Sequence, residues 1–117
     1  MVLHWKGRKT GQAYSTPVSR REQDGKLFAM TRAGFKHNFV GGAPAELVVD
    51  GKRSPYLATA IDDPDVIGRR MRAVLDDLGP KQGARALALT IEGDPTEAEL
   101  AAYAAAQGYM LLDFEAA

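Results

Sequence analysis

The chain of 117 residues contains no cysteine and only two histidines. Without cysteine, disulfide bridges, thiolate zinc sites and a thiol nucleophile are all excluded. The two histidines, His4 and His37, are far apart in the sequence. A histidine-rich metal centre is therefore not expected, and we predict no metal site.

Long hydrophobic runs and an excess of charge of one sign are also missing. No apolar stretch approaches the roughly 20 residues needed to span a bilayer. A charged turn follows Met1 within a few residues, where a signal peptide would need an apolar segment. We therefore expect a cytoplasmic protein without membrane insertion. The 15 basic and 15 acidic residues balance, which argues against a nucleic-acid partner.

The charges are nevertheless distributed unevenly along the chain. Residues 1–36 carry eight Lys and Arg but only two acidic residues, whereas the segment from Glu92 onward has neither Lys nor Arg. This asymmetry indicates an anionic ligand near the N-terminal elements. The length and the 45% share of hydrophobic residues predict one domain, residues 1–117, with one core.

The hydrophobic pattern predicts mostly short strands. Two Asp-Gly pairs, at Asp24 and at Asp50, are strong signals for tight hairpin turns. Residues 84–91 alternate, which predicts a strand, with the end of a helix as the alternative. The other predicted strands are residues 2–6, 13–22, 26–31, 45–49, 53–61 and 109–114. Pro17 places the second of these at an edge or a bulge.

Two helices are predicted in the second half of the chain. Asp63 as N-cap and Pro64 at the first helical position open a helix whose apolar residues recur every three or four positions up to Leu78. Residues 96–107 form the second helix, which Gly108 ends. The fold class expected is mainly β with helices (α+β), an antiparallel barrel or meander with one amphipathic helix packed on it and another helix before the last strand.

The most informative segment is a basic turn between the first two strands, residues 7–11, which reads Gly-Arg-Lys-Thr-Gly. Its glycines permit tight backbone, and its cations, hydroxyl and N–H groups suit a phosphate or carboxylate. It lacks the spacing of a Walker loop. A solvated tip of a hairpin explains the same residues, and composition alone leaves both interpretations open.

A second candidate segment follows the third strand and combines cations, aromatic rings and an amide, from Thr31 to Phe39. Binding residues often lie on such loops. His37 is able to donate to a ligand, although a lone loop histidine is more often a surface residue. Trp5 is expected in the core. No pattern of acids, serine and histidine identifies a catalytic group, so we assign no catalytic residue.

Two stretches resemble one family. Residues 7–11 with the downstream Thr16, Pro17 and Val18 resemble the Gly-Arg-Lys-Ser/Thr-Gly and Thr-Pro-Leu/Val signature of the deazaflavin-dependent nitroreductase family. Those proteins are split β-barrels related to FMN-binding pyridoxamine-phosphate oxidases. Residues 35–44 are similar to the family's aromatic-x-x-Asn-Leu segment. The resemblance covers about residues 3–62, and Tyr14 stands where members often carry Arg.

The resemblance implies a split β-barrel, a homodimer and a deazaflavin cofactor, coenzyme F-420. It implies an oxidoreductase that transfers a hydride to a small unsaturated or nitro-type organic substrate. The cofactor-binding residues carried over are Arg8, Lys9, Thr10, Ser15, Thr16, Thr31, Arg32, Ala33, Gly34 and Asn38. An FMN-dependent oxidoreductase is an alternative on the same fold. A non-catalytic binder of a flavin, haem, fatty acid or other anionic ligand is another.

Overall fold

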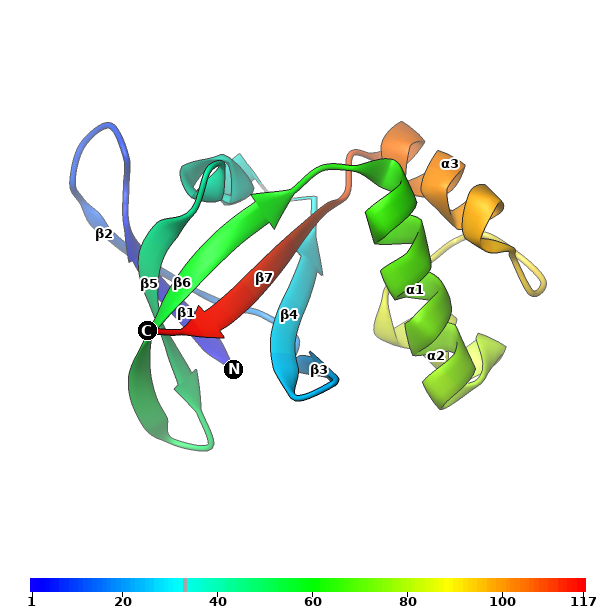
Figure 1. Ribbon diagram of the computed structural model, residues 1–117, viewed down its shortest axis with the longest axis horizontal. Helices are drawn as coiled ribbons and strands as arrows, with labels where there is room; N and C mark the ends of the chain where they lie inside the picture. Colours follow the sequence, from blue (N-terminus) through cyan, green and yellow to red (C-terminus); the bar gives the residue numbers. More distant parts are fainter. Residues whose placement is uncertain (33) are drawn as a thin grey trace. The chain divides into compact units, whose positions relative to one another are not determined.

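Seven strands form one antiparallel sheet in the order β2-β1-β5-β6-β7-β4-β3 (Figure 1). A computed structural model describes residues 1–32 and 34–117. The strands are β1 (Val2–Lys6), β2 (Ala13–Pro17), β3 (Arg21–Gln23), β4 (Lys26–Thr31), β5 (Ala43–Val49), β6 (Lys52–Ile61) and β7 (Met110–Ala116). A 3-10 helix, η1 (Gly34–Phe39), precedes β5. The expected mainly-β α+β fold is confirmed.

Both Asp-Gly pairs form the predicted hairpin turns. Asp24 and Gly25 have φ of 52° and 78°, and Asp50 and Gly51 have φ of 52° and 79°. Positive φ at both central residues defines the type I′ turn, whose twist matches that of paired strands. The turns fix the register of β3 with β4 and of β5 with β6.

The connection between β2 and β3 requires the sheet to curl. These two strands are the opposite edges of the sheet, yet only residues 18–20 lie between them. In a flat sheet of seven strands the edges would be roughly 29 Å apart. Four residues of extended chain span at most about 14 Å. The sheet is therefore curled into a half-barrel whose two edge strands approach each other without pairing.

The inside of the half-barrel is the hydrophobic core. Alternate residues of the inner strands point inward, for example Leu3 and Trp5 on β1 and Leu112 and Phe114 on β7. Phe39 at the end of η1 is fully buried in the same core. The expected core position of Trp5 is confirmed, and η1 is anchored by its last residue.

Two strand predictions differ from the structure. The strand predicted for residues 13–22 is two strands, because β2 pairs with β1 while β3 pairs with β4. The strand predicted for residues 84–91 is wrong, because the chain is helical up to Ala86 and residues 87–91 form no strand. Gly79 ends one helix and Pro80 starts the next at its preferred first position, and the Ala-rich sequence then favours helix.

Three helices lie in the segment Ile61–Met110, which clusters as a compact unit distinct from the β unit of Met1–Ala60 and Leu111–Ala117. They are α1 (Pro64–Leu78), α2 (Pro80–Ala86) and α3 (Glu97–Gln107). The prediction of one domain stays a prediction. Asp63 caps α1 as expected, accepting from the Asp65 N–H at 3.0 Å. None of the described helices is both long and apolar enough to cross a membrane.

Helices α1 and α3 pack closely at a glycine of α1, Gly68. A Cβ atom at Gly68 would lie 2.7 Å from the Glu97 carbonyl oxygen and 2.8 Å from the Ala101 nitrogen. Arg72, one turn later, donates to Asp94 at 2.6 Å and to the Pro95 carbonyl at 2.7 Å, and also to Asp76. Hydrogen bonds to Asp94 and Asp76 raise the pKa of Arg72 above its ordinary value.

We predict that Gly68→Ala destabilises the helical unit, although alanine is the better helix former. The new methyl group overlaps the backbone of α3, which cannot move aside as a side chain would. The expected loss is about 1–3 kcal/mol in the free energy of unfolding, measured by urea denaturation followed by circular dichroism. Arg69→Ala, at an exposed neighbour, should change it by at most about 0.5 kcal/mol. Equal or greater stability of Gly68→Ala would contradict the close packing.

Candidate functional site

The basic turn, residues 7–11, has a defined conformation. The Gly7 N–H donates to the Gln12 carbonyl at 2.8 Å, and the Gly11 N–H donates to the Gly7 carbonyl at 2.9 Å. Gly11 has a φ of 69°, in the left-handed region that glycine adopts without strain. The Thr10 hydroxyl accepts from the Gln12 N–H at 3.2 Å. The turn is therefore held internally rather than being a loose hairpin tip.

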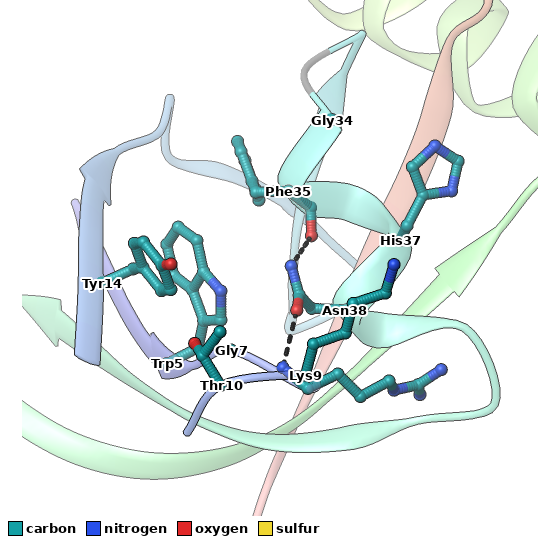
Figure 2. A pocket seen from close by; sticks show the side chains of 10 residues that line it. Trp5, Gly7, Lys9, Thr10, Tyr14, Gly34, Phe35, His37 and Asn38 are labelled. Atoms are coloured by element: carbon teal, nitrogen blue, oxygen red, sulfur yellow. Dashed lines mark hydrogen bonds between the residues drawn. The ribbon is translucent and has the colours of Figure 1, made fainter. Parts of the chain in front are cut away.

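Asn38 fastens this turn to η1. Its Oδ1 atom accepts from the Arg8 backbone N–H at 3.0 Å, and its Nδ2 atom donates to the Phe35 carbonyl at 2.9 Å (Figure 2). The Arg8 guanidinium also donates to the Val40 carbonyl. Two segments thirty residues apart, which the sequence analysis singled out separately, thus form one site.

A cavity of about 550 Å³, the first cavity, lies between the turn and η1. Pockets for small molecules and cofactors usually measure roughly 300–1,000 Å³. Its lining comes from the end of β1, the basic turn, the start of β2 and η1. The lining residues are Trp5, Gly7, Arg8, Lys9, Thr10, Tyr14, Gly34, Phe35, His37 and Asn38.

One side of the first cavity is an aromatic wall of three rings, Trp5, Tyr14 and Phe35. Trp5 stacks on Tyr14 with ring centroids 5.6 Å apart and lies 5.0 Å from the ring of Phe35. A Cβ atom at Gly7 would lie 2.9 Å from Cε2 of Tyr14. The glycine therefore lets the Tyr14 ring, which is 42% exposed, lie close over the start of the turn.

Trp5 also brings an unsatisfied polar atom to this wall. The residue is only 9% exposed, and its indole Nε1 is buried without a hydrogen-bond partner in the described part of the chain. A buried donor left unpaired costs about 1–3 kcal/mol. Such atoms are uncommon in folded proteins and often mark a functional position.

The opposite end of the first cavity is positively charged. Neither the Lys9 ammonium nor the backbone N–H groups of Lys9 and Thr10 have an acceptor within residues 1–32 and 34–117. Successive free N–H groups beside a cation form a concave site for an anion. The first cavity therefore combines a positively charged end, whose donors suit an anion, with an aromatic wall.

The structure brings together half of the predicted cofactor-binding residues. The five that line the first cavity are Arg8, Lys9, Thr10, Gly34 and Asn38. Four others line neither this cavity nor the second one described below, namely Ser15, Thr16, Thr31 and Arg32. The remaining prediction, Ala33, lies outside the described residues.

The aromatic wall is a part of the site that the sequence did not predict. Trp5 was assigned to the core alone, and Tyr14 was noted only as a departure from a motif. The length of the turn does indicate this pairing. If Gly7 pairs with Gln12 across the turn, the next residues outward along the two strands place Tyr14 opposite Trp5. Cross-strand neighbours on one face of a sheet lie within contact distance.

No protein-family description, curated protein or solved structure matches the chain. The residues that the structure describes include no group of three or more His, Asp or Glu arranged to hold a metal ion.

We predict that Asn38→Leu releases the basic turn from η1. Leucine has a similar size but neither accepts from Arg8 nor donates to Phe35. Exchange of the Arg8 amide hydrogen, followed by NMR, should accelerate about 10-fold or more, the effect of losing a bond of about 1.4 kcal/mol. Asn38→Asp keeps the acceptor oxygen and should preserve the protection. Equal exchange in Asn38→Leu and the wild type would show that the turn is held in another way.

Proposed function

We propose that the first cavity binds a deazaflavin cofactor, coenzyme F-420, and that the protein is a deazaflavin-dependent oxidoreductase. It would transfer a hydride to a small unsaturated or nitro-type organic substrate. One observation carries the proposal. The hydrogen bond from the Arg8 N–H to Asn38 joins an anion-binding turn to an aromatic wall around a single cavity. A planar ring with a phosphate end needs both.

The phosphate end of the cofactor fits the basic turn. Lys9 offers a charge and, with Thr10, two backbone N–H groups that no acceptor of the described chain uses. The guanidinium of Arg8 is held on the Val40 carbonyl, so it adds positive charge at a fixed position. Charge-assisted bonds from such donors to phosphate are the strong class of hydrogen bond in proteins.

The ring of the cofactor fits the aromatic wall. Phe35 and Tyr14 offer faces for stacking, and aromatic pairs gain about 0.5–1.5 kcal/mol beyond their buried area (Figure 2). Trp5 completes this wall through its stacking on Tyr14. When bound, the cofactor supplies the hydride, and the protein contributes orientation and exclusion of water.

Two alternatives use the same residues. FMN presents a similar ring and a phosphate, so the contacts described would suit it as well. A non-catalytic binder of a flavin, haem, fatty acid or other anionic ligand is favoured by one residue. Tyr14 stands where the resembling family often carries Arg, so a charge is replaced by an exposed ring.

The test is a titration of the purified protein with F-420 and, separately, with FMN. We expect F-420 to bind with micromolar affinity or better. Lys9→Ala should weaken binding about 10-fold, the loss of one charge-assisted bond of about 1.5 kcal/mol. Lys52→Ala removes an exposed lysine that lines neither cavity and serves as the matched control, with unchanged affinity.

Each outcome separates the alternatives. Tighter binding of FMN would move the assignment to an FMN-dependent enzyme. Binding of F-420 without its oxidation in the presence of nitroaromatic or unsaturated acceptors would favour the non-catalytic binder. Absence of micromolar binding to either cofactor would overturn both enzyme assignments. If Lys9→Ala bound the cofactor with unchanged affinity, the basic turn would not be part of the binding site.

We also propose that the protein is a homodimer in the cytoplasm. Strand β2 is an edge of the sheet, and exposed edges favour association with another strand. Sedimentation of the purified protein measures the oligomeric state directly.

A further inference from the structure

A second cavity lies where β1 separates from β5. The two strands pair from Val2 with Val48 to His4 with Glu46, and the pairing ends there. The same register would place Lys6 opposite Pro44. The odd-numbered positions along β1 direct their backbone hydrogen bonds to β2, so the even-numbered ones, Lys6 among them, direct theirs toward β5. Pro44, at the opposite position on β5, has no N–H to donate. A proline thus accounts for the opening in the sheet.

The opening leads into a cavity of about 540 Å³, the second cavity. Its walls are mainly small apolar side chains and rings, including Ala43, Pro44, Ala45, Pro55 and Tyr56. Such a lining accommodates an apolar ligand body of substantial size.

The two cavities are neighbours, because they share a wall. Trp5, Tyr14, Arg8 and Asn38 line both. A ligand in the second cavity therefore contacts residues that also line the proposed cofactor site.

The charges around the second cavity leave an excess of positive charge. Arg53 binds Glu46 through two hydrogen bonds of 3.1 Å, one to each carboxylate oxygen. The hydrogen bond from Arg53 lowers the pKa of Glu46, so this carboxylate stays ionised and committed to its partner. Lys6, by contrast, has no partner within the described residues. Lys6 and Arg8 thus have no acidic side chain as partner in the described part of the chain, and against the terminal carboxylate of Ala117, which also lines this cavity, one positive charge remains in excess.

We propose that the second cavity binds a mostly apolar organic anion, with Lys6 as the charge that recognises its carboxylate. If the proposed function holds, on which this part rests, the anion is the substrate, an unsaturated carboxylic acid beside the cofactor ring. The apolar body packs on the alanine and proline side chains and on Tyr56.

The probe is trans-cinnamate, an apolar unsaturated carboxylate, compared with the neutral cinnamamide of nearly equal shape. Both are titrated into the whole protein without cofactor, and NMR follows the backbone shifts. We expect cinnamate to bind about 10-fold more tightly than the amide, the worth of one charge-assisted bond. The shifts should concentrate at His4, Lys6 and Ala43.

Two variants and a control test the site. Lys6→Gln should remove the preference for cinnamate and leave the binding of the amide as it is. Ala13 is exposed, lies opposite Lys6 and lines only the second cavity. Ala13→Phe should therefore weaken both probes about 10-fold by filling space, and its thermal unfolding checks that it folds. Lys52→Gln should change nothing.

Equal affinity for the two probes, or shifts confined to Gly34 and His37 of the first cavity, would overturn the proposal. Binding of cinnamate that Lys6→Gln leaves unaltered would overturn it as well. Failure of the proposed function looks different. The wild type would then bind no F-420 or FMN but would still prefer cinnamate to the amide. Lys6→Gln would still lose that preference, and the two results together would support the anion site alone.

Discussion

The β unit depends on one covalent constraint, the short connection between its two outermost strands. Residues 18–20 join β2 to β3, which are the two edges of the seven-stranded sheet. No flat arrangement satisfies that connection, so the sheet must curl and enclose its core. The curl gathers β1, β2 and η1 around the first cavity. The binding geometry is thus a consequence of chain length as much as of side-chain chemistry.

Local signals predicted most of the elements, because each depends on neighbouring residues. The type I′ turns at Asp24 and Asp50 and the capped start of α1 at Asp63 all follow from such rules. The error at residues 84–91 has a local cause as well. Alternation of alanine and leucine suits a strand, but these residues also favour helix, and Pro80 started one.

The site was predictable only in part, since its construction is not local. Arg8, Lys9 and Asn38 were identifiable from motifs, but the bond between the turn and Asn38 spans thirty residues and requires the fold. The aromatic wall depends on the register of β1 with β2. The second cavity depends on the register of β1 with β5, which places Pro44 opposite the backbone of Lys6. No short motif in the sequence describes that register. Long-range pairings of this kind decide what short motifs are able to do.

The place of Trp5 has a practical consequence for anyone who purifies this protein. It is the only tryptophan of the chain, and its ring borders both cavities. The intrinsic fluorescence of the protein excited at the red edge of the spectrum comes from this one indole. The emission maximum and the quenching of this indole therefore report on the surroundings of the two cavities without any label, and unfolding, which exposes the indole to water, shifts the emission to longer wavelength.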